Sequence, residues 1–126
     1  MINIKPIIFN ELKKVCKNVN DTYPSNWATF PIIQYIEEDN KTTLKTDDKE
    51  QQAYIRYKID IWNDRSTSDI AVAVDGVLSL LGLERIQCLD APDPKQLKHK
   101  VIRYEGIIDV NNMRVYSAKG WWNNVS

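Results

Sequence analysis

The stretch from Gln52 to Leu83 constrains the fold of this chain more than any other part of the sequence. Over its first part, Ala53 to Trp62, side chains of two kinds alternate with a period of two. That period predicts a half-buried strand with one face toward a core and one toward solvent or a partner. The side chains predicted to face the core are Ile55, Tyr57, Ile59 and Ile61, and those predicted on the outer face are Tyr54, Arg56, Lys58, Asp60 and Trp62.

An amphipathic helix is predicted after the polar turn at residues 63–65. Its apolar residues recur at the spacing of one helix face, and they are Ile70, Val74, Val77, Leu78 and Leu81. Ser66 and Asp69 resemble a capping box at the start of this helix. Gly82 stands where a left-handed residue ends a helix, and Leu83 can then fold back onto the last turn.

The flanking segments predict one more helix and several strands. A helix is expected from Pro6 to Val19, because its apolar residues form a stripe at helical spacing: Ile8, Leu12, Val15 and Val19. Strands are expected over residues 29–37, 84–89, 98–110 and 113–116, with a tight turn at Asn111 and Asn112. This order predicts a single α+β domain over residues 1–126, in which a mainly antiparallel sheet packs against two helices.

Two segments carry no periodic pattern. Residues 38–50 are dense in charge, which predicts a long hairpin loop that either serves an interface or is solvated and without a task. Residues 117–126 form a C-terminal tail with Trp121 and Trp122. Tryptophan is enriched at interface hot spots, so this pair either contacts a partner or packs back over its own domain.

The overall charge bears on the class of partner. The chain has 17 basic and 17 acidic residues, and its formal net charge is therefore zero. Proteins that act by neutralising nucleic-acid phosphates carry a basic excess, so specific nucleic-acid binding is not expected. The first residues lack the pattern of a signal peptide, and no apolar run reaches the roughly 20 residues of a membrane span. Reduced, buried thiols are predicted for Cys16 and Cys88.

The reactive residues do not form a recognisable catalytic or metal site. His99 is the only histidine, and a surface position between two lysines is expected for it. The two cysteines lack zinc-site spacing, and the four glycines cannot form a phosphate-binding loop. Asp60 and Lys58 are explained by a cross-strand ion pair better than by a nuclease site. The chain is therefore expected to be no enzyme and to bind no cofactor and no metal.

Three motifs together resemble the tail terminator, or tail completion, proteins of tailed bacteriophages and their prophage relatives. The strand YIRYKIDIWNDRS is similar to the family's Y-x-V-D-V-W strand. The helix IAVAVDGVLSLLGLERI is similar to its alanine-rich helix that ends near glycine and arginine. The segment KHKVIRYEGIID is similar to its basic approach to R-Y-x-x-x-x-D. The matching positions are Tyr57, Ile59, Asp60, Ile61 and Trp62, then Leu78, Gly82, Leu83 and Arg85, and finally Arg103, Tyr104 and Asp109.

The resemblance implies a ring, commonly hexameric, that forms at the head-proximal end of the tail tube, stops tube growth and offers a surface for head joining. The implied partners are other copies of the chain, the tail tube protein and the head-tail connector. The resemblance also implies that the protein assembles in the host cytoplasm and then forms part of the virion. The alternatives are another connector or tail structural protein, or a small intracellular enzyme. The candidate interface residues are Lys41, Leu44, Lys45, Arg56, Lys58, Asp60, Trp121 and Trp122.

Overall fold

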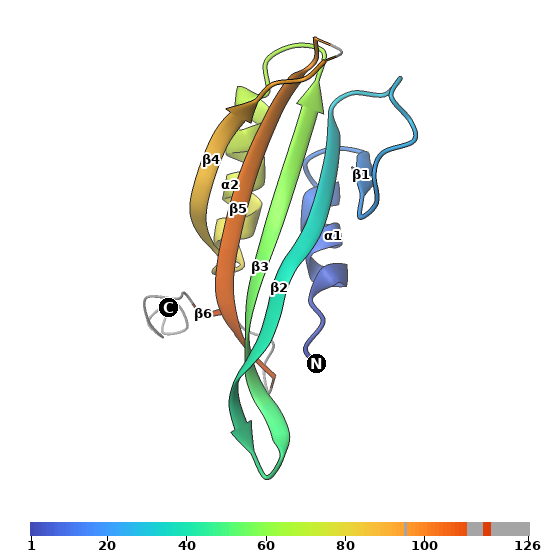
Figure 1. The fold of residues 1–126 in the computed structure, drawn as a ribbon. Helices are drawn as coiled ribbons and strands as arrows, with labels where there is room; N and C mark the ends of the chain where they lie inside the picture. The colour runs from blue at the N-terminus through green and yellow to red at the C-terminus, as the bar shows by residue number, and fades with distance from the viewer. Residues whose placement is uncertain (95, 111–114, 117–126) are drawn as a thin grey trace.

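The fold is that of a computed structural model, which describes residues 1–94, 96–110 and 115–116. Its elements follow the order α1 (Lys5–Lys13), β1 (Asn18–Asn20), β2 (Ile32–Thr46), β3 (Lys49–Asn63), α2 (Ser68–Leu80), β4 (Glu84–Ala91), β5 (Lys98–Asp109) and β6 (Val115–Tyr116) (Figure 1). The arrangement is α+β, as the sequence predicts. Within the described residues, no helix is long and apolar enough to cross a membrane.

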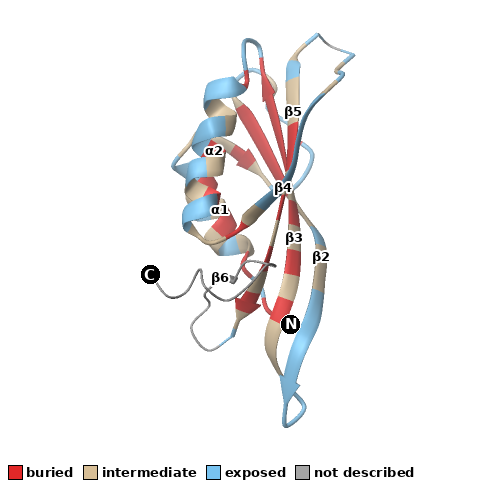
Figure 2. Ribbon diagram, turned by 90° about the vertical axis from the view of Figure 1, so that its left-hand side faces the viewer, coloured by how far each residue is buried: buried red, intermediate tan, exposed pale blue. Residues whose placement is uncertain are grey.

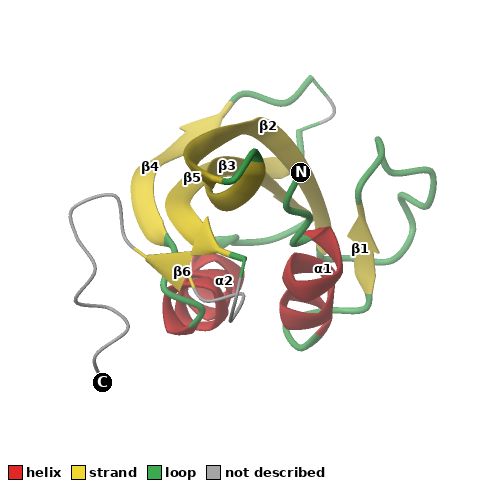
Figure 3. Ribbon diagram, turned by 90° about the horizontal axis from the view of Figure 1, so that it is seen from below, coloured by secondary structure: helices red, strands yellow, loops and turns green. Residues whose placement is uncertain are grey.

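One sheet contains all of these strands. Its order is β1-β2-β3-β5-β4, and β6 pairs with β5. The pairs β2–β3, β3–β5, β4–β5 and β5–β6 are antiparallel, whereas β1 runs parallel to β2 over three residues. Seen from below, the sheet is a curved wall with both helices on the same side of it (Figure 3). The opposite face of the sheet is called the outer face from here on, and no helix of the described residues lies on it.

The hydrophobic core lies between the helices and the sheet (Figure 2). The predicted alternation of β3 is confirmed, because Ile55, Tyr57, Ile59 and Ile61 are all fully buried. The predicted seam of α2 is confirmed at Val74 and Leu78, which are also fully buried; its other members, Ile70, Val77 and Leu81, are partly buried against the core.

The N-terminal helix is shorter than predicted. It ends at Lys13, and Val19 belongs to β1 instead of to a helical stripe. Val19 is still buried, at 8% exposure, because it enters the core from a strand. The side-chain amide of Asn18 donates to the carbonyl oxygens of Asn26 and Thr29, at 2.9 and 3.0 Å, which ties β1 to the loop that follows it.

The start of α2 also differs from the prediction, whereas its end agrees. Thr67 is the N-cap and makes no side-chain capping bond, so the predicted capping box is wrong. Instead, the hydroxyl oxygen of Ser66 accepts a hydrogen bond from the Ser68 amide at 3.2 Å. At the other end, Gly82 has φ 98° and the amide of Leu83 donates to the Leu78 carbonyl at 3.3 Å, which confirms the left-handed C-cap.

The prediction of a long loop at residues 38–50 is wrong. These residues belong to β2, β3 and the turn that joins them. The turn consists of Asp47 and Asp48, whose φ angles are 53° and 61°. Two consecutive positive φ values are those of the type I′ hairpin turn, and aspartate tolerates this region better than most residues. The charged stretch is therefore the far end of a long hairpin (Figure 1).

Candidate functional site

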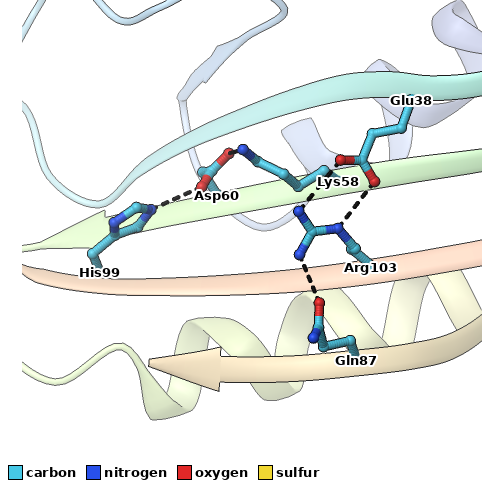
Figure 4. Close-up of polar contacts among 6 residues, drawn as sticks. All are labelled: Glu38, Lys58, Asp60, Gln87, His99 and Arg103. Atoms are coloured by element: carbon cyan, nitrogen blue, oxygen red, sulfur yellow. Dashed lines mark hydrogen bonds and ion pairs between the residues drawn. The ribbon is translucent and has the colours of Figure 1, made fainter. Parts of the chain in front are cut away.

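The outer face of the sheet gathers the polar side chains that alternate with the core residues of β3. Arg56, Lys58 and Asp60, three predicted interface residues, all come from this face. In the close-up of Figure 4, Lys58 and Asp60 lie with side chains of β2, β4 and β5 across the sheet, and the helices lie behind it. These side chains come from distant parts of the sequence. The antiparallel pairing of β3 with β2 and with β5 brings them together.

The centre of this network is an ion pair between Glu38 and Arg103. The guanidinium Nε of Arg103 donates to Glu38 Oε1 at 3.0 Å, and its Nη2 donates to Oε2 at 3.4 Å. Its third nitrogen, Nη1, donates to Gln87 Oε1 at 2.6 Å. One arginine of β5 thus connects β2 with β4 across the outer face. Two nitrogens of the Arg103 guanidinium contact the two carboxylate oxygens of Glu38, and this bidentate geometry is the strongest for an arginine–carboxylate pair.

A second arginine shares the same carboxylate. The Nε of Arg56 lies 3.3 Å from Glu38 Oε1, which is within ion-pair distance. That nitrogen is buried, yet its N–H makes no well-directed hydrogen bond. The contact is therefore electrostatic attraction without a full hydrogen bond, and one carboxylate serves two guanidinium groups.

Asp60 forms a second group, with Lys58 and His99. Its side chain is 5% exposed, and its Oδ1 accepts a hydrogen bond from His99 Nε2 at 2.8 Å while Oδ2 lies 3.5 Å from Lys58 Nζ. The predicted ion pair with Lys58 is present, but it joins two residues of β3 two positions apart and not residues of two strands. The expected surface position of His99 is wrong, because its side chain is only 15% exposed.

Aromatic rings cover this end of the outer face. The His99 ring stacks on Trp62 with centroids 4.5 Å apart and planes 17° apart. Trp27 meets Trp62 edge to face at 5.3 Å, and Tyr23 contacts both tryptophans. Trp62 is consequently 6% exposed, although it belongs to the predicted outer face. Sequence reasoning missed this cluster, whose one signal is the pair of aromatic residues in the turn-rich loop before β2.

The arrangement around His99 is suited to holding strands together. An acid paired with histidine also occurs in hydrolases, where the histidine contacts a nucleophile. Here the described part of the chain supplies no hydroxyl or thiol hydrogen-bonded to the ring, and Nε2 already contacts Asp60. Among the described residues, no group of three potential metal ligands gathers either. Cys16 and Cys88 are free thiols; Cys16 is half-buried, and Cys88 is exposed on β4, which corrects the prediction that both are buried.

The end of the β2–β3 hairpin is the other candidate surface, and it holds Lys41, Leu44 and Lys45. Residues 41–49 are all exposed, and Leu44 is 46% exposed. The hairpin is held mainly by pairing between its two strands. A hydrogen bond of 2.6 Å from the Thr42 hydroxyl to Glu50 and a contact of the Lys41 ammonium with the Tyr54 ring at 5.1 Å reinforce it. Trp121 and Trp122, the last two candidates, lie outside the described residues.

No family model matches this chain, and no curated protein matches it.

Proposed function

We propose that this chain is a structural subunit of a phage tail or tail-like particle, a tail terminator that forms a ring with other copies of itself. The ring would end growth of the tail tube at its head-proximal end and give the head-tail connector a surface to join. The subunit assembles in the host bacterial cytoplasm and remains in the particle. It carries out no catalysis and uses no cofactor.

The β2–β3 hairpin carries this proposal. Beyond the helices it continues as two strands, and residues 41–49 are exposed throughout in the part of the chain that the structure describes (Figures 1 and 2). A two-stranded hairpin alone is marginally stable in water. From Thr42 to Thr46, at about 3.3 Å per residue, the arm extends roughly 13 Å. An arm of this kind gains stability when another surface packs against it, which supports a role in assembly.

The outer face gives independent support. Its charged side chains are fixed by ion pairs across three strands, and no described nucleophile or metal-ligand cluster accompanies them. Fixed charges of both signs give an interface its specificity and register. A chain of zero net charge also opposes its own assembly less than a strongly charged one. Both features favour a structural role over an enzymatic one.

The test is a hairpin that lacks its tip. Residues 45–51 are replaced by Asn-Gly, which joins the register partners Leu44 and Gln52 by a two-residue turn. The variant gene replaces the natural one in the phage or prophage that this proposal implies. We expect a folded protein that no longer caps tubes, so that electron microscopy of the particles shows tubes of uncontrolled length without heads. A matched pair of charge reversals refines the result: Lys45→Glu on the arm should impair capping, and Lys17→Glu beside α1 should not.

The C-terminal tryptophans need a separate variant. A chain that ends after Lys119 lacks Trp121 and Trp122, and we expect it to fold but to lose capping. If this variant and the shortened hairpin both cap tubes at normal length, the proposal fails for both segments. If the full-length chain leaves tube length unchanged but binds portal or connector complexes, it is another head-tail connector protein instead.

A further inference from the structure

Both edges of the sheet are open over part of their length. Within the described residues, the far edge of β2 is paired only at Ile32–Gln34, by β1, and β4 is paired only with β5. Among the described residues, the edge of β2 is thus unpaired from Tyr35 to Thr46, and the edge of β4 over its whole length. An open edge presents a row of backbone donors and acceptors that can pair with another strand.

The middle of β4 lacks the charges that usually protect an edge. Ile86, Gln87, Cys88 and Leu89 are uncharged and exposed, and the two large apolar residues among them are 43% and 39% exposed. Natural proteins protect open edges with charged side chains, proline or bulges, whereas β4 has charges only toward its ends, at Glu84, Arg85 and Asp90, and one bulge near Ile86. This uncharged stretch is therefore suited to the addition of a strand.

The two open edges have opposite strand directions and lie at the same level. Three successive antiparallel pairings separate β2 from β4, so these two strands run in opposite directions. Along the ladder, Cys88 is paired with Ile102, Ile102 with Ile59, and Ile59 with Tyr35. Cys88 and Tyr35 therefore mark the same level at opposite edges of the sheet. A rotation about an axis along the strands preserves both level and direction. Such a rotation brings β4 of one copy beside β2 of the next, in antiparallel orientation.

We propose that copies of this chain join edge to edge, with the open edge of β4 in one copy pairing antiparallel with the open edge of β2 in the next. This inference rests on the proposed ring and identifies its subunit contact. The contact is heterologous, because two different edges meet, and repeated heterologous contacts close into a ring when the rotation allows. The strand that pairs with each open edge belongs to a second copy of this chain, because one chain supplies two open edges at the same level and with opposite strand directions.

Cross-linking tests the contact, with Cys88 as a built-in reporter. In a Cys16→Ala background, Glu37→Cys places a second thiol on β2, on the same face of the sheet as Cys88 and two residues from its level. A short bifunctional maleimide reagent is then applied to the assembled protein. We expect a ladder of covalent multimers from the variant with thiols at positions 37 and 88. The Cys16→Ala chain alone should stay monomeric in the gel. The matched control is Val72→Cys in that background, a thiol on α2 at a position that is 73% exposed, and it should give no ladder.

A charge on the edge provides a second measurement. Ile86→Lys, at a position that is 43% exposed, should raise the concentration needed for half-assembly at least about tenfold in sedimentation experiments, which corresponds to about 1.4 kcal/mol. Val72→Lys should leave it unchanged. A covalent dimer from Cys16→Ala alone would mean that β4 pairs with itself, and the absence of any ladder would also overturn the inference. Capping of tubes without a ladder would refute this contact and leave the proposed function standing. A ladder without capping of tubes would support this contact and refute the proposed function.

Discussion

Tyr57 and Tyr104 are register partners on β3 and β5, both fully buried, and each donates its hydroxyl hydrogen bond to a carboxylate of a different element. Tyr57 donates to Glu37 of β2 at 2.7 Å, and Tyr104 donates to Asp75 of α2 at 3.0 Å. Asp75 in turn lies 3.3 Å from Arg85 of β4. The two phenols thus connect the centre of the sheet with a neighbouring strand on one side and with the helix layer on the other.

The first prediction concerns alkaline pH. Burial, together with the nearby carboxylates, raises the pKa of both phenols above the ordinary value of about 10. A raised pKa in the folded state stabilises the fold below pH 10, and that stability is lost as the pH rises above it. At pH 11 the loss should be about 1.4 kcal/mol for each phenol. Denaturant unfolding at pH 8 and pH 11 measures it. The Tyr57→Phe/Tyr104→Phe double variant should show a smaller loss, and an equal loss would contradict the prediction.

The second prediction compares two leucines of α2. Leu78 is fully buried in the core, whereas Leu80 is 89% exposed two residues later. Leu78→Ala should lower the free energy of unfolding by about 2–5 kcal/mol, as large-to-small changes in cores do. Leu80→Ala should stay within about 0.5 kcal/mol. Urea melts of the two variants measure the difference, and a reversed order would show that the packing face of the helix is wrong.

The third prediction compares two glycines of the same segment. Gly82 has a positive φ of 98°, so Gly82→Ala should be destabilising by about 1 kcal/mol or more. Gly76 lies inside α2, and a Cβ there would have nothing within 4 Å. Gly76→Ala should therefore stabilise the protein, by about 0.4–1 kcal/mol. Thermal melts should show a lower melting temperature for Gly82→Ala and a higher one for Gly76→Ala. Shifts of the same sign would contradict the prediction that only Gly82 requires the backbone freedom of glycine.

The fourth prediction concerns the buried Asp60. His99→Phe keeps a ring beside Trp62 but removes the hydrogen bond to Asp60, so we expect a loss of about 1–3 kcal/mol. Asp60→Asn should also be destabilising. Because the two residues contact each other at 2.8 Å, the double variant should lose less than the sum of the single losses. Additive losses in this cycle would mean that the contact contributes nothing to stability.

The central strand and helix could be predicted because burial imposes a periodic pattern on their sequence. Apolar residues alternate from Ile55 to Ile61 because the helices cover one face of β3. Val74 and Leu78 recur at helical spacing because one face of α2 packs against the core. The end of the hairpin has no such pattern, since neither of its faces is buried. Pairing between strands holds it, and pairing leaves little trace in composition. Its only signal is the Asp47-Asp48 pair, whose tolerance of positive φ marks a tight turn.

The candidate site could be predicted only in part, because it depends on strand register. Arg56, Lys58 and Asp60 could be assigned to one face from their spacing alone. Their partners could not, because Glu38 and Arg103 are 65 positions apart and Asp60 and His99 are 39 apart. A lone histidine between lysines resembles a surface residue. Only the pairing of β3 with β5 brings its ring onto Trp62 and makes it part of the buried end of the outer face.

The short strand β1 limits how other chains can approach this protein. It occupies the edge of β2 at Ile32–Gln34 and nowhere beyond. A strand that adds to β2 can therefore slide toward the hairpin tip but is stopped in the other direction. Sliding by one residue would turn every side chain of the added strand to the opposite face. A barrier of three residues thus sets one end of the alignment, and removing it would leave the sheet with an edge that any extended chain could join at several offsets.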